Sequence, residues 1–191
     1  MKVAINKTKY QVKTSANLTC REYIEYNKRH DNTILDYLAI TTKQEYKSIA
    51  DTSFDMLTLN RLNSYIQPLK LVEHLERSYL FRYTKTGQIV SAKTFNFESV
   101  GTVFLIQSKA QETKSNLELM IYLLAIAIQK NYDAEKIEQI YNELLDYNYI
   151  QVYSFIYFFF RNFMSGSKKK VKLSSRLKKM FTINTHQKSK K

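Results

Sequence analysis

The chemically reactive side chains of this chain are few and lie far apart. The chain has one cysteine, Cys20, and three histidines, His30, His74 and His186. A metal site needs several such ligands at short, regular spacing, and a nucleophilic thiol needs a histidine as its base. Neither arrangement is present in the sequence, and Cys20 falls inside a helix-capping motif. The sequence therefore predicts no catalytic residue, no metal ligand and no cofactor, with Cys20 as a buried, inert thiol.

Positive charge is concentrated at the end of the chain. The formal net charge is +13, and residues 168–191 hold 10 of the 30 Lys and Arg residues but none of the 17 acids. The rest of the chain is close to neutral, so a charge-driven contact with an acidic partner or with phosphates belongs to this segment. The residues predicted to make that contact are Lys168, Lys169, Lys170, Lys172, Arg176, Lys178 and Lys179.

Apolar residues recur at helical spacing inside the basic segment. Leu173, Leu177 and Phe181 are flanked by cations, a pattern typical of a short basic amphipathic helix. An acidic protein is the preferred partner, because only Phe181 offers the aromatic stacking used by single-strand binders. Nucleic-acid phosphates and a membrane surface stay open as alternatives, as does a solubilising extension without a partner.

Composition favours a helical, intracellular protein. Three Gly and one Pro among 191 residues disfavour a fold with many tight turns. A single cysteine cannot form an internal disulfide, and the first residues lack the continuous apolar stretch of a signal peptide. The longest uncharged stretch, residues 147–160, is 14 residues long, whereas a spanning helix needs about 20. No transmembrane segment is expected.

Sequence patterns predict a mainly α fold of the α+β kind, with a small N-terminal and central β-hairpin element. Residues 3–12 and 80–91 alternate apolar and polar side chains, and we expect them to build one small β element. The first of these segments is predicted to be one strand or a small hairpin that turns about Asn6–Lys7. Capping boxes at 19–22, 42–45 and 115–118 predict three helix starts. Further helical patterns cover residues 34–40, 54–66, 97–104, 117–130, 133–145 and 149–163.

The helical pattern before Pro68 must end or kink there, which closes a first unit. Residues 1–67 are predicted to form a strand-plus-helices unit. Residues 68–165 are predicted to form a helical unit with a small β element and an aromatic last helix, packed with the first unit as one domain. Residues 166–191 form the basic tail.

The predicted last helix, residues 149–163, is unusually apolar. Eleven of its fifteen residues are aliphatic or aromatic, so no face is clearly polar. Two interpretations stay open: an intramolecular core, or a surface that covers a hydrophobic segment of another protein. The aromatic residues in question are Tyr153, Phe155, Phe158, Phe159, Phe160 and Phe163.

Three stretches of the chain resemble the tail assembly chaperones of long-tailed bacteriophages. Residues 9–26, KYQVKTSANLTCREYIEY, are similar to that family's opening strand and Leu-Thr helix cap. Residues 34–49, ILDYLAITTKQEYKSI, are similar to its short helix and connection, although Thr41-Thr42 stands where Thr-Gly is common. Residues 123–139, LLAIAIQKNYDAEKIEQ, are similar to a later helix pair.

The resemblance implies a small, helical, non-enzymatic protein that binds tape-measure or tube proteins during tail assembly. It implies the host-cell cytoplasm as the place of action and phage structural proteins as partners, and it carries over no catalytic residue. An alternative is a virion structural component, such as a head–tail connector or an internal cargo protein, whose basic tail contacts acidic surfaces or packaged DNA. A nucleic-acid-binding accessory protein is a third interpretation.

Overall fold

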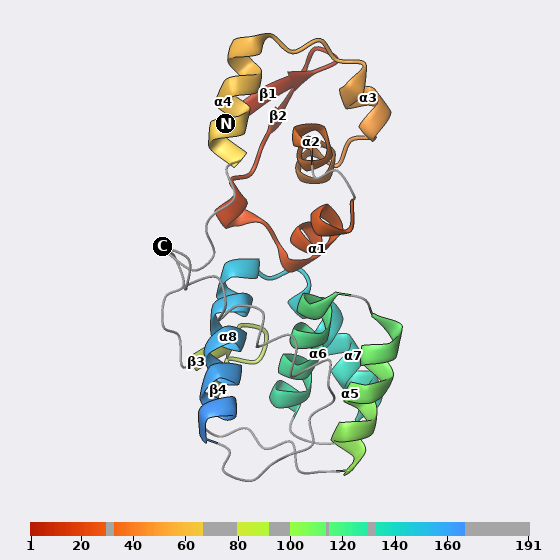
Figure 1. Cartoon of the computed structure of the whole chain (residues 1–191), viewed down its shortest axis with the longest axis vertical. Coiled ribbons are helices and arrows are strands. Elements are labelled where there is room, and N and C mark those ends of the chain that lie inside the picture. The colour runs from red at the N-terminus through yellow and green to blue at the C-terminus, as the bar shows by residue number, and fades with distance from the viewer. Residues whose placement is uncertain (30–32, 67–79, 92–99, 114, 130–132, 167–191) are drawn as a thin grey trace, which may run out of the picture.

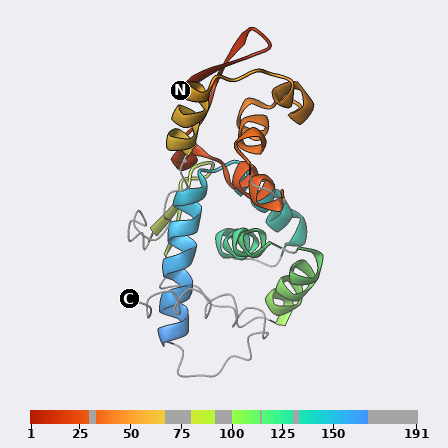
Figure 2. The same ribbon diagram turned by 45° about the horizontal axis from the view of Figure 1, so that its top comes forward.

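Helices make up most of the structure, together with two antiparallel two-stranded sheets, which confirms the predicted mainly α class. The computed structural model describes residues 1–29, 33–66, 80–91, 100–113, 115–129 and 133–166, and it describes residues 100–103 and 158–166 by their backbone alone. Figures 1 and 2 show two lobes, the first built from the chain before residue 67 and the second from the chain after residue 79.

In its described residues, 1–29 and 33–66, the first lobe contains one hairpin and four α-helices. Its elements are β1 (Lys2–Ile5), β2 (Thr8–Gln11), a short 3-10 helix (Ser15–Asn17), α1 (Cys20–Lys28), α2 (Ile34–Thr42), α3 (Tyr46–Ala50) and α4 (Met56–Ile66). The second lobe contains the other hairpin and the remaining helices. Its elements are β3 (Leu80–Tyr83), β4 (Gln88–Ser91), α5 (Val100–Glu112), α6 (Asn116–Gln129), α7 (Ala134–Leu144) and α8 (Tyr149–Gly166).

The two alternating segments form separate hairpins instead of the single β element that we expected. β1 pairs only with β2, and β3 pairs only with β4, among the described strands. Asn6 and Lys7 have φ of 49° and 69°, the left-handed pair that a tight two-residue hairpin turn requires, so the predicted turn position is confirmed. β1 buries Val3 and Ile5, and β3 buries Phe81 and Tyr83, on alternate positions of each strand.

The capping box predicted at residues 19–22 is confirmed. Thr19 Oγ1 accepts from the backbone N–H of Glu22 at 3.2 Å, and the Glu22 carboxylate accepts from the Thr19 N–H at 2.9 Å. α6 likewise begins after the predicted Ser115 cap, whose hydroxyl lies 3.4 Å from the Glu118 nitrogen. An equivalent box between Thr33 and Asp36 starts α2 and was not predicted.

The capping box predicted at residues 42–45 is wrong. Thr42 is the last residue of α2, and its hydroxyl donates to the Leu38 carbonyl at 2.6 Å instead of capping the next helix. Residues Leu38–Ile40 are buried, and their packing keeps the chain helical as far as Thr42. α2 then ends at Lys43, which has a left-handed φ of 56°. α3 starts only after Glu45.

α6 lies at the centre of the second lobe. Its residues from Leu119 to Ile128 are all buried, as its uniformly apolar sequence requires. Lys109 of α5 joins the surrounding helices: its Nζ lies 3.0 Å from the Glu138 carboxylate and 4.5 Å from the ring centre of Tyr141, both on α7. Its charge is therefore paired while its stem packs in the core.

These caps give a direct stability test. Thr19→Ala removes a real capping box and should lower the free energy of unfolding by about 1 kcal/mol. Thr42→Ala removes only a bond to the preceding helical turn and should change it by less than about 0.5 kcal/mol. Urea denaturation of both variants measures the difference. Equal losses would mean that residue 42 does cap a helix.

Candidate protein-interaction site

The aromatic helix α8 begins at a junction between the two lobes. The Cys20 and Arg21 backbone N–H groups donate to the carbonyls of Tyr147 and Leu145 at 2.9 and 2.8 Å. The Tyr149 N–H donates to the Leu18 carbonyl at 3.0 Å. These bonds place the start of α1 beside the start of α8 in antiparallel orientation, and we call residues 18–21 with 145–149 the lobe junction.

Asn148 starts α8 and ties it to the first lobe. Its Oδ1 accepts from the backbone N–H groups of Ile150 at 3.0 Å and Gln151 at 3.3 Å, which caps the helix. Its Nδ2 donates to the Ala16 carbonyl at 2.7 Å. One side chain thus satisfies both the helix end and a loop more than a hundred residues earlier.

An aromatic stack supports the same junction. The rings of Tyr23 on α1 and Tyr149 on α8 lie 4.2 Å apart between centres and are nearly parallel at 9°. Burial raises the pKa of Tyr149 to about 12, with a smaller contribution from Tyr23, so the phenol stays neutral at physiological pH. The stack is therefore an uncharged packing contact and not an ionisable site.

The first turns of α8 are part of the core. Val152, Phe155 and Ile156 are at most 2% exposed, and the Phe155 ring lies 5.6 Å from that of Phe81 on β3. For Phe155 the core interpretation therefore holds. Tyr153, the other predicted contact residue in this half, is half-buried and its ring stacks at 6.4 Å on that of Tyr157.

The second half of α8 continues as a helix to Gly166, so helical register relates its aromatic positions to the first half. Phe159 and Phe163 stand seven residues, about two turns, after the buried Val152 and Ile156. Phe158 stands seven residues after Gln151, which is exposed.

The remaining predicted contact residues have no described side chains. Those on α8 are Phe158, Phe159, Phe160 and Phe163. Those that lie outside the described residues altogether are Leu173, Leu177, Phe181, Lys168, Lys169, Lys170, Lys172, Arg176, Lys178 and Lys179. The contacts expected of both groups stay predictions.

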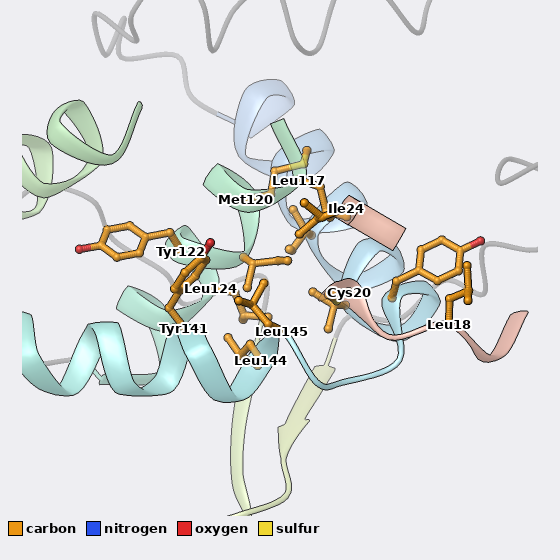
Figure 3. Packing of buried hydrophobic residues seen from close by; sticks show 14 of the residues in the cluster. Leu18, Cys20, Ile24, Leu117, Met120, Tyr122, Leu124, Tyr141, Leu144 and Leu145 are labelled. Atoms are coloured by element: carbon orange, nitrogen blue, oxygen red, sulfur yellow. The ribbon is translucent and has the colours of Figure 1, made fainter. Parts of the chain in front are cut away.

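Cys20 lies in the middle of the core cluster at the lobe junction. Figure 3 shows it between residues of α1 and Leu145, and its exposure is 0%. Burial raises the pKa of the thiol to about 12, and the Asp146 charge adds to the effect. A thiol with so little thiolate and no access to solvent is a poor nucleophile, which confirms the predicted burial.

Several carboxylates of the described residues serve helix caps and ion pairs. Burial acts to raise the pKa of Asp36, but hydrogen bonds from Thr33 and Arg29 outweigh it and lower the pKa below its usual value. Glu118 pairs with Lys28 of α1 at 2.8 Å, and Asp146 pairs with Arg21 at 3.0 Å. The last two pairs link the lobes, so their acids have structural partners.

Two features of the surface were not predicted from the sequence. Leu57 belongs to the apolar helical pattern of residues 54–66, yet it is 61% exposed, whereas Leu62 and Ile66 are buried. The role of Asn148 at the junction was also missed. An Asn before an apolar helix is a recognisable cap signal, but its second contact spans 132 positions and leaves no local pattern.

No protein-family model, curated protein or solved structure matches the chain. Within the described part of the chain, no three His, Cys, Asp or Glu residues are grouped as metal ligands would be. The three histidines fall outside that part. A search of the same residues finds no helix with the length and apolar character needed to cross a bilayer.

The state of Cys20 can be tested by thiol labelling. In the folded protein at about pH 8, DTNB should react with Cys20 only as fast as the protein opens, because the buried thiol is protonated. In urea the same reagent should label it fully within minutes. Rapid stoichiometric labelling of the folded protein would contradict both its burial and its raised pKa.

Proposed function

We propose that this protein is a non-enzymatic assembly protein whose helix α8 binds a hydrophobic segment of a client protein. Its resemblance to phage tail assembly chaperones suggests tape-measure or tube proteins as the clients, with binding in the host-cell cytoplasm before the tail polymerises. The basic tail would add contacts to acidic surfaces or phosphates of the same assembly. The proposal concerns binding and involves no chemical reaction.

The observation that carries the proposal is that α8 continues as a helix, with further aromatic residues, beyond its buried first turns. The first half is fixed in the core by Phe155 and Ile156 and by the lobe junction. The helix then continues through Phe158, Phe159 and Phe160 to Gly166. Each buried aromatic side chain removes about 150–250 Å² from water, so several uncovered ones would exceed the apolar patch that a soluble monomer usually exposes. A client segment would cover them.

The reactive groups of the described chain also support a binding role. The Cys20 thiol is buried, and burial raises its pKa to about 12. Asp36 and Glu118 are largely buried and are held in ion pairs by basic residues. None of these groups is an accessible acid, base or nucleophile of the kind that catalysis needs.

The experiment is a pull-down of the tail-tube and tape-measure proteins encoded in the same genome. Phe158→Ser, in the second half of the helix, should reduce client capture at least about tenfold while leaving the thermal melting curve unchanged. Phe155→Ala should instead lower the free energy of unfolding by about 3–5 kcal/mol, because it opens a cavity in the core. The exposed Gln151→Ala is the matched control for the helix surface.

Other outcomes would contradict the proposal. If Phe158→Ser and Gln151→Ala capture clients equally well, the second half of α8 is not the binding surface. If Phe158→Ser melts as early as Phe155→Ala, the whole helix is core. Recovery of the protein from purified virions in stoichiometric amounts would favour the alternative of a virion structural component.

A further inference from the structure

The outward face of α4, on the first lobe and far from α8, combines exposed apolar residues with a shallow depression. Met56 is 71% exposed and Leu57 is 61% exposed. Figure 1 shows α4 along one side of this lobe, next to the N-terminus. The open depression beside it has a volume of about 530 Å³ and is lined by Met1, Asn60, Arg61, Ser64 and Tyr65.

Helical spacing joins the exposed apolar residues to the depression. Leu57, Asn60, Arg61 and Ser64 follow at intervals of three and four, so they share one face of α4. The opposite face is fixed, because Leu62 is fully buried. From residue 57 to residue 65 the helix rises about 12 Å, a length that about four residues of extended peptide would cover at about 3.3 Å each.

Two cationic groups line the depression, the Arg61 guanidinium and the Met1 ammonium. Arg61 is exposed and has no ion pair among the described residues. The Met1 ammonium donates to the Tyr65 hydroxyl at 2.8 Å. One acid is near: hydrogen bonds from Thr58 lower the pKa of Asp55, and the Arg61 charge contributes less. That carboxylate already accepts from the Thr58 N–H at 2.6 Å.

We propose that this face binds a short acidic peptide segment of a partner protein. An apolar side chain of the segment would occupy the depression beside Tyr65, and a second would pack on Leu57. A carboxylate between them would accept hydrogen bonds from the Arg61 guanidinium, which is shaped for carboxylates. A purely electrostatic site would not need the exposed Leu57 and Met56, and a purely apolar one would not need the exposed Arg61. This site is separate from α8 and stands without the proposed client.

The test is an NMR titration of the full-length protein with the peptide N-acetyl-Asp-Leu-Glu-Leu-amide. Backbone amide signals of Leu57, Asn60, Arg61 and Ser64 should shift together as the peptide binds. The uncharged counterpart N-acetyl-Asn-Leu-Gln-Leu-amide should bind at least about tenfold more weakly, because it cannot form charge-assisted hydrogen bonds with the guanidinium.

Single substitutions show which side chains bind the acidic peptide. Arg61→Gln and Leu57→Ser should each weaken the acidic peptide about tenfold or more. Arg82→Gln, which changes an exposed arginine on β3 in the other lobe, should leave its affinity unchanged. All three positions are exposed, so melting temperatures should agree with the unaltered protein.

Several results would overturn the inference. Equal binding of the two peptides, an effect of Arg82→Gln as large as that of Arg61→Gln, or shifts confined to other residues would each exclude this site. No detectable shift at millimolar peptide would do the same. Tighter binding of an oligothymidylate than of the acidic peptide, with the same Arg61 dependence, would identify the face as a phosphate site instead.

Discussion

The lobe junction is the constraint on which the rest of this structure depends. Its backbone hydrogen bonds join residues 18–21 to residues 145–149, so the start of α1 and the start of α8 are held together. The first N–H groups of any helix have no partner within that helix. In α1 two of them, at Cys20 and Arg21, find carbonyl partners in the other lobe. The orientation of α8, and with it the position of its aromatic residues, follows from this pairing.

Local sequence signals predicted the elements whose determinants are local. The Thr19 box and the Asn6–Lys7 turn depend on residues within a few positions, and both are as expected. Thr42 shows where this reasoning fails. Its capping motif predicts the start of a helix, but the apolar residues before it extend α2 through Thr42. The motif alone does not say whether its Thr ends one helix or starts the next. Burial decides, and burial depends on residues distant in the sequence.

In the candidate site, too, local features could be predicted from the sequence and long-range contacts could not. Composition identified α8 as core or interface, and burial of Phe155 assigns its first half to the core. Sequence could not make that assignment, because the partners of Phe155, such as Phe81 on β3, are 74 positions away in the chain. The exposure of Leu57 could not be predicted for a related reason. The apolar residues of α4 cover a wider face than the neighbouring elements can bury, so residues at the edge of that face stay in solvent. How much of the face is buried depends on the fold.

Native-state hydrogen exchange at the lobe junction tests the central claim most directly. The Cys20 and Arg21 amides are first-turn amides that only the contact with Leu145 and Tyr147 protects. They should exchange as slowly as the Leu124 amide in the buried helix α6, whereas the Leu57 amide in the exposed first turn of α4 should exchange rapidly. Exchange of Cys20 and Arg21 at the rate of Leu57 would show that the lobes separate without global unfolding, and would contradict the account.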